Sequence, residues 1–555
     1  MEGFHVLDWI VLGLFVLGLV AIIVWVSRMK EDTSSDYFLA GRDAGWIAIG
    51  ASIFASNIGS EHLVGLAGAG ASSGMAMAHW EMHGWLILVL GWLFVPFYAR
   101  SGVFTMPEFL ERRYNSASRS LLSIISLVSY VLTKVAVTVY AGGIVFKEVF
   151  GIESIWGIDF FWIGAIGLVV ITGIYTTIGG MKSVLYTSVL QTPVLLVGSI
   201  TIVIVGLIKV GGWGEMQEIF EQSKNLTEHG DSMMGLIRSS QDAEFPWTGV
   251  ILGSAIIGFW YWNTDQFIVQ RVLSGRNQTQ SRRGAIFGAY LKLLPVFIFL
   301  IPGLIAFALN EKGLIELTDS DAAFPTLVNQ LLPIGLKGIV VGGLLAALMS
   351  SLAALFNSSA ALFTVDFYKK YKPQATEKNL VFVGRMATIV IVVLGIAWIP
   401  VMKGIGKVLY EYLQDVQSLL APGIASVFLL GVFWKKATPA AGLAGLATGF
   451  VLGMIRLAFN IFADSVPDDT WYYYIWVEPN WLHYEIYLFG LCLLVIFVVS
   501  FFTKPAEESQ LVGVTYFSST PEQRAISKAS YSKWDVINSL IIIGIIIAFY
   551  IYFWK

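Results

Sequence analysis

Residues 55–62 read ASNIGSEH and lie in the middle of an apolar segment that extends over residues 46–77. A helix that crosses lipid must satisfy its own backbone, so small and polar residues at mid-depth are tolerated only where they face protein, water or a ligand. We therefore predict that this segment is a membrane-spanning helix that is interrupted at residues 55–62.

The composition of the chain is that of a membrane protein. Hydrophobic residues make up 56% and charged residues 13%, and the mean hydropathy is +0.72. Apolar runs recur along the whole chain, and each is long enough to cross about 30 Å of hydrocarbon. These runs predict an all-α integral membrane protein with about fourteen transmembrane helices. The first run, residues 7–26, lacks the cleavage site of a signal peptide and is expected to be retained.

The charged residues indicate the orientation of the chain and exclude some functions. A net charge of −3 with scattered basic residues argues against binding to nucleic acid. Basic residues are concentrated in alternate loops, for example at Arg28, Arg113, Arg282 and Lys435. The positive-inside rule then places both termini outside a plasma or inner membrane. The single cysteine, Cys492, allows no internal disulfide.

A second apolar segment, residues 247–272, is interrupted in its inner half by the polar and aromatic sequence WYWNTDQ at residues 260–266. Two broken helices, each opening a run of five spans, are typical of a transporter built from inverted repeats. In such a protein the substrate is bound at the membrane midplane, where the two breaks meet.

Two ionisable residues lie within or at the start of predicted spans. Glu81 begins the third span and Lys292 lies inside residues 284–309. Each could instead lie near a helix end and extend to the membrane surface. Four further residues complete a set that suits a sugar, because it offers directed hydrogen bonds and an indole face for the apolar side of a pyranose. These residues are Asn57, His62, Trp262 and Gln414.

A pair of serines, Ser350 and Ser351, lies midway along another strongly apolar segment. A serine in such a helix can simply bond the preceding turn or permit close helix packing. Alternatively, the two hydroxyls and the carbonyls freed by the first broken helix could bind a sodium ion, which prefers several oxygen ligands. The spacing of these residues leaves both interpretations open.

Five motifs that recur in order along nearly the whole chain resemble the sodium/glucose cotransporters of the solute:sodium symporter family. They are GASIFASNIGS at residues 50–60, FTMPEFL at 104–110, WYWNTDQFIVQR at 260–271, SSLAALFNS at 350–358 and FLLGVFWK at 428–435. The resemblance implies a LeuT-like core of 5+5 inverted repeats in residues 46–435, with discontinuous first and sixth core helices. It also implies an extra N-terminal helix and cytoplasmic loop in residues 1–45 and three peripheral helices in residues 436–555.

The same resemblance implies uptake of a hexose, such as glucose or galactose, coupled to sodium by alternating access. It assigns contacts with the sugar to Asn57, His62, Trp80, Glu81, Tyr261, Trp262, Lys292 and Gln414, with Tyr261 closing the site towards the cytoplasm and Trp80 lying on its outer side. It assigns contacts with sodium to the carbonyls of Ala55, Ile58 and Ala347 and to the hydroxyls of Ser350 and Ser351.

One departure from the family pattern bears on the number of sodium ions. Ser188 stands where many relatives carry an aspartate linked to a second cation site or to cation release, and Ala353 nearby has no hydroxyl. The expected stoichiometry is therefore one sodium per sugar. His62 fits a sugar site, because histidine and the glutamine found in a bacterial relative can both donate and accept hydrogen bonds.

Two other functions remain open on the sequence. The chain could carry another small solute with sodium, such as an inositol, or it could bind sugar as a sensor without accumulating it. An enzyme is not expected, because no nucleophile and base or metal constellation is evident. The expected partners are a small neutral sugar, sodium and membrane lipid, with no obligatory protein partner evident.

Overall fold

The computed structural model describes residues 5–29, 33–59, 61–223, 231–317, 319–403 and 409–554. These residues are almost entirely helical, apart from one short antiparallel hairpin of β1 (Ser154–Ile155) and β2 (Ile158–Asp159). Ten helical segments within them are long and apolar enough to cross a membrane. The prediction of an all-α, multi-pass membrane protein is confirmed, whereas the count of fourteen helices stays a prediction. The longest single helices are α1 (Val6–Ser27), α11 (Phe160–Val210), α18 (Leu336–Ala361), α20 (Glu377–Lys403), α21 (Leu409–Phe433), α22 (Pro439–Ile461), α24 (Trp481–Phe502) and α27 (Lys533–Tyr552).

The first predicted interruption is present. Helix α3 (Trp46–Asn57) ends at mid-segment, and Ile58 is extended with φ −77° and ψ 100°. The chain then resumes as the π-helical turn η2 (Glu61–Leu66) and continues as α4 (Ala67–Ser72). Because a helix terminus leaves carbonyls without intrahelical donors, the last turn of α3 presents free backbone oxygens inside the bundle.

The second predicted interruption separates α13 (Trp247–Asn263) from α14 (Gln266–Leu273). Asp265 between them is extended, with φ −76° and ψ 127°, and its side chain accepts a hydrogen bond from the Phe267 amide as an N-cap. This side-chain cap satisfies one of the amides that the start of α14 would otherwise leave unpaired.

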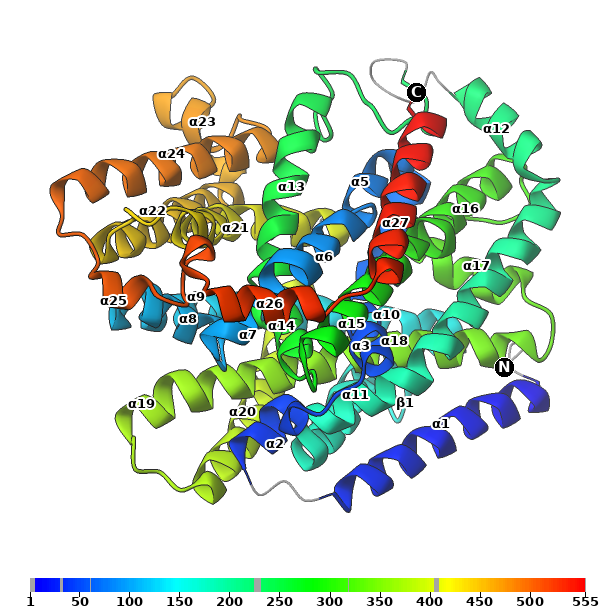
Figure 1. The fold of residues 1–555 in the computed structure, drawn as a ribbon. Helices are drawn as coiled ribbons and strands as arrows, with labels where there is room; N and C mark the ends of the chain where they lie inside the picture. Colours follow the sequence, from blue (N-terminus) through cyan, green and yellow to red (C-terminus); the bar gives the residue numbers. More distant parts are fainter. Residues whose placement is uncertain are drawn as a thin grey trace.

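The two broken helices lie within a bundle around α18, which is largely buried, whereas α11 packs against α18 and keeps many apolar side chains exposed. Both α11 and α18 contact α3. Figure 1 shows α1 in blue along one edge, where it contacts α11 and α18. At the upper left of the view, across from α1, α21, α22 and α24 pack together, and α13 joins this group through α21 and α24. Helix α27 packs against α15 (Gln278–Lys292) and α6 (Gly84–Val89).

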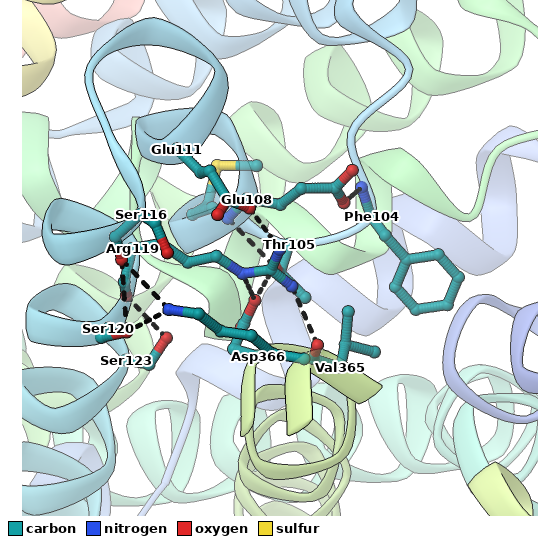
Figure 2. Close-up of polar contacts among 12 residues, drawn as sticks. Phe104, Thr105, Glu108, Glu111, Ser116, Arg119, Ser120, Ser123, Val365 and Asp366 are labelled. Carbon is teal, nitrogen blue, oxygen red and sulfur yellow. Dashed lines mark hydrogen bonds and ion pairs between the residues drawn. The ribbon is translucent and has the colours of Figure 1, made fainter. Parts of the chain in front are cut away.

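A polar network joins the short helix α8 (Met106–Arg113) to two candidate membrane spans, residues 116–147 and residues 336–371. Figure 2 shows Arg119, on α9 (Ser116–Tyr130), between Glu111 on α8 and Asp366 on η9 (Leu362–Tyr368). The guanidinium lies 2.5 Å from the Glu111 carboxylate and 2.8 Å from the Asp366 carboxylate. The Thr105 hydroxyl donates to Asp366 at 2.9 Å, so the N-cap of α8 joins the same network.

Gly180 makes a sharp bend inside the long helix α11. Its φ of 45° and ψ of −138° lie outside the region that residues with a side chain adopt. A Cβ at this position would also meet the Tyr37 carbonyl and lie 2.8 Å from Tyr37 Cδ2. The bend therefore requires glycine.

We expect Gly180→Ala to destabilise the protein by about 1–3 kcal/mol, the usual cost of a strained backbone conformation. The measurement is the thermal melting temperature of the purified protein in detergent. Gly167→Ala on the same helix is the matched control, because no atom lies within 4 Å of the added Cβ and the backbone there is not left-handed. Equal melting temperatures for the two variants would contradict the requirement for glycine at position 180.

Candidate functional site

The two interruptions border one small cavity of about 40 Å³. Its walls come from the end of α3, from η2, from α5 (Ala78–Glu81), and from α13, α15 and α21. All eight residues predicted to contact the sugar line it, although they are spread over more than three hundred and fifty positions of the chain. They are Asn57, His62, Trp80, Glu81, Tyr261, Trp262, Lys292 and Gln414.

Glu81 is the centre of the polar side of the cavity. Lys292 Nζ lies 2.5 Å from its Oε2, and His62 Nε2 lies 3.4 Å from its Oε1. Asn57 Nδ2 lies 3.2 Å from His62 Nε2, which extends the chain of contacts to the break in α3. Because both side chains of the Glu81–Lys292 pair are at most 5% exposed, each charge depends on the other for compensation.

Two indoles form the aromatic side of the cavity. Lys292 Nζ lies 5.4 Å from the centroid of Trp262, so the ammonium contacts both the carboxylate and an aromatic ring. Trp80 stacks on Trp481 of α24, with centroids 5.7 Å apart and planes 21° apart. The stacking fixes the Trp80 ring, and the flat faces suit the apolar side of a sugar ring.

Several buried polar atoms of the cavity have no hydrogen-bond partner among the described residues. They are Trp80 Nε1, His83 Nε2 and Gln414 Oε1. A buried donor or acceptor without a partner costs about 1–3 kcal/mol, so such atoms are rare unless a ligand or water pairs with them. Two of the three belong to residues that the sequence assigned to the sugar.

The cavity also contains polar residues that the sequence analysis missed. Glu61, His83 and Gln417 line it together with the predicted residues. Local spacing could have found them, because Glu61 precedes His62, His83 follows Glu81 by two positions, and Gln417 is one helical turn from Gln414. The remaining lining residues are Ile257, Gly258 and Leu413.

The Ser351 hydroxyl lies directly against the break in α3. It donates at 2.9 Å to the Ser56 carbonyl and lies 3.2 Å from the Ile58 carbonyl. Three oxygens from two helices are thus gathered at one point, next to a cavity wall that begins at Asn57. Such a cluster of uncharged oxygens suits a hard monovalent cation.

The other predicted sodium ligands lie on the same two helices. Ala55 and Ile58 are buried at the end of α3, and Ala347 is buried on α18 one turn before Ser351. The Ser350 hydroxyl instead lies 3.4 Å from the Ser188 hydroxyl of α11. Ser188, where the resemblance implies an aspartate in many relatives, therefore contacts a predicted sodium ligand.

Comparisons with known proteins identify relatives of the whole chain. The sodium:solute symporter family matches residues 37–449 of the chain. The sodium/myo-inositol cotransporter 2 of Oryctolagus cuniculus is 35% identical over 545 residues, which cover 92% of this chain and 79% of that protein. The sodium/glucose cotransporter 4 of Homo sapiens is 34% identical over 563 residues, which cover 97% of this chain and 82% of that protein.

The fold also matches a solved structure. A sodium-coupled sialic acid symporter in a substrate-bound outward-open state has a TM-score of 0.75, with 20% identity, and the match covers 91% of this chain and 99% of that one. The chain belongs to the sodium:solute symporter family. It is a multi-pass, sodium-coupled transporter of LeuT-like fold and not an enzyme, and its substrate is a small solute.

We expect Ser351→Ala to raise the sodium concentration that gives half-maximal uptake by about tenfold or more, because a hydrogen-bonding group lost from a charged partner costs about 1.5–3 kcal/mol. The measurement is solute uptake into proteoliposomes as a function of sodium. Ser359→Ala is the control, since this buried hydroxyl of α18 has no partner among the described residues. An unchanged sodium dependence in Ser351→Ala would contradict a role for Ser351 in binding the ion.

Proposed function

We propose that the chain is a sodium-coupled symporter for a neutral hexose of the glucose or galactose type, working by alternating access. The observation that carries this proposal is the Glu81–Lys292 pair in the cavity wall. Because the ammonium is already compensated by a carboxylate, it is not free to bind an anionic substrate. Both groups remain able to make charge-assisted hydrogen bonds with hydroxyls.

The rest of the cavity supports a polyhydroxylated substrate. Asn57, His62 and Gln414 offer donors and acceptors from separate helices, so they can meet hydroxyls that point in different directions. Trp262 and Trp80 supply ring faces for the apolar side of a pyranose. A site that forms directed hydrogen bonds with its substrate strongly rejects analogues that lack the matching hydroxyls.

Sodium would couple to the sugar through the break in α3. An ion shared by the Ile58 carbonyl and the Ser351 hydroxyl would tie α3 to α18, and Asn57 next to it lines the sugar cavity. An ion can drive a conformational change only if it binds one conformation better than the other. We propose that sodium favours the outward-facing conformation, which presents the cavity to the sugar.

We also propose the arrangement of the chain in the cell membrane. Both termini lie outside, residues 46–435 form the ten-helix transport core, and residues 1–45 and 436–555 add peripheral helices. The alternating distribution of basic residues between loops supports this orientation.

A cyclitol such as myo-inositol is the second candidate substrate. The sodium/myo-inositol cotransporter 2 of Oryctolagus cuniculus is as similar to this chain as the glucose cotransporters are. An inositol ring offers hydroxyls and an apolar face much as a hexose does, so the same cavity residues could bind it. A sensor that binds sugar without accumulating it is the third possibility.

The test is uptake of labelled glucose, galactose and myo-inositol into proteoliposomes, with and without an inward sodium gradient. We expect sodium-dependent accumulation of a hexose. Gln414→Ala should raise the half-saturating sugar concentration by up to about tenfold, the value of one lost hydrogen bond. Gln222→Ala, at an exposed position of α12 (Trp213–Gln222), is the control.

Each other outcome of this test has a clear meaning. Accumulation of myo-inositol in preference to both hexoses would replace the hexose proposal by the cyclitol. Sodium-dependent binding without accumulation would identify a sensor and overturn symport.

We expect one sodium ion to enter with each sugar, because Ser188 supplies a hydroxyl where many relatives carry a carboxylate. A membrane potential of about 100 mV contributes about 2.3 kcal/mol for one charge, and a tenfold sodium gradient adds about 1.4 kcal/mol, so this ratio supports roughly several hundredfold accumulation. The measurement is the sodium-to-sugar flux ratio in proteoliposomes held at a known potential. A ratio of two would contradict the proposal.

A further inference from the structure

A second buried ion pair lies beside the cavity, on residues that the proposed sugar and sodium sites do not use. Lys134 belongs to the π-helical turn η5 (Val131–Val135), which follows α9, and Asp265 lies in the break between α13 and α14. Lys134 Nζ is 2.9 Å from Asp265 Oδ2, and the two side chains are only 3% and 2% exposed. Segments of π-helix are often retained at functional positions.

Aromatic rings surround the Lys134 ammonium. Its Nζ lies 4.2 Å from the centroid of Phe267 and 4.3 Å from that of Tyr261, and two more rings lie within 6 Å. These two rings are those of Tyr130 and Trp260. A desolvated cation over aromatic faces is attracted more strongly than an exposed one. The position of the ammonium is therefore determined by the carboxylate and the rings together.

Asp265 links this lysine to the start of α14. Its Oδ1 accepts from the Phe267 amide at 3.1 Å, and it also accepts a hydrogen bond from the Tyr130 hydroxyl. The Tyr130 hydroxyl in turn accepts from the same amide at 3.1 Å. Lys134 of η5 thus contacts the rings of α13, and Tyr130 of α9 contacts the start of α14, so both halves of the interrupted helix are held.

Tyr261 connects the cluster of Lys134, Asp265, Tyr130 and Phe267 to the cavity. Its side chain lines the cavity, whereas those of Lys134, Asp265 and Phe267 do not. Its ring contacts Trp262 on the cavity side, with centroids 4.9 Å apart, and Phe267 of α14, with centroids 6.2 Å apart. After Phe267, α14 continues to Leu273, before the loop that leads to α15, and none of its residues lines the cavity. Tyr261 thus separates the cavity from the side of the bundle on which α14 ends.

We propose that Lys134, paired with Asp265, is a positioning residue that holds Tyr261 as the barrier between the cavity and the α14 side of the membrane. The inference builds on the proposed function, because a barrier of this kind makes sense in a transporter that opens its cavity to one side at a time. If Tyr261 or α14 moved, the Lys134 ammonium would lose its contact with the Tyr261 and Phe267 rings or with the Asp265 carboxylate. The cluster therefore stabilises the state in which the α14 side is closed.

The decisive variant is the double substitution Lys134→Met and Asp265→Asn. Either single substitution leaves an uncompensated buried charge, which destabilises the protein for reasons unrelated to a barrier. The double variant removes both charges of the pair, whereas the buried Arg271 guanidinium, which Asp265 also attracts, keeps its charge. If the pair served only to compensate charge, the double variant would behave like the wild type.

The readout is chemical access to the cavity in the absence of substrate. A reporter cysteine, Leu413→Cys in a Cys492→Ala background, lines the cavity and is the only cysteine in the chain. A membrane-impermeant maleimide is applied to vesicles from each side separately. We expect the double variant to be labelled about fivefold faster or more from the α14 side, the lower end of typical coupling effects, with no change from the other side.

Two further variants separate a barrier from a general loosening of the fold. Lys147→Met with Glu153→Gln removes a partly exposed ion pair joined to α10 (Ala136–Phe150), which continues from η5, and should leave labelling unchanged. Lys134→Arg keeps the charge and should keep labelling slower than in the double variant. Labelling of the double variant at the wild-type rate would overturn the proposal, as would equal acceleration from both sides.

The same vesicles distinguish this proposal from the substrate assignment. Labelling is read without sugar, so it reports on the barrier whichever solute the protein carries. A wild-type protein that accumulates none of the three solutes would overturn the proposed function and leave the labelling rates to decide the role of Lys134.

Discussion

An interrupted helix inside a membrane is the constraint on which both predicted sites depend. Hydrocarbon offers no hydrogen-bond donors, so the carbonyls at the end of α3 must find partners within the protein. The Ser351 hydroxyl meets two of them, at Ser56 and Ile58, and the packing of α3 against α11 and α18 keeps the break away from lipid. The same interruption turns Asn57 and His62 into the cavity. Without the break, neither the oxygen cluster nor this wall of the cavity would exist.

The proposed sodium site and the solute cavity therefore share the same short stretch of chain at the end of α3. Ile58, whose carbonyl contacts Ser351, directly follows Asn57, whose side chain reaches His62 and through it Glu81. An ion that orders the end of α3 would also order this wall of the cavity, and binding free energies coupled in this way are reciprocal. The second interruption adds Tyr261 and Trp262 from the opposite side. Sodium binding and solute binding can therefore be coupled without a long chain of intervening contacts, because the ion and the solute act on the same few residues.

Much of this arrangement could be predicted from the sequence, because polar residues are conspicuous in lipid. Both interruptions and all eight residues predicted to contact the sugar, including Gln414 far along the chain, follow from that argument together with the family resemblance. Contacts between helices could not be predicted. The contact of Ser350 with Ser188, the Lys134–Asp265 pair and the entry of His83 into the cavity depend on how distant segments pack. Helix count was also hard to predict, because α11 runs through its bend at Gly180 over 51 residues.

Coupling between sodium and sugar through the break in α3 is tested most directly by the affinity of the purified protein for sugar, measured at equilibrium in sodium and in an equal concentration of choline. Sodium is expected to lower the sugar dissociation constant by about fivefold or more, the scale of typical coupling between sites. This sodium effect should disappear in Ser351→Ala, while sugar binding itself should persist. Equal sugar affinity in the two salts, or a full sodium effect in the variant, would contradict coupling through the break in α3.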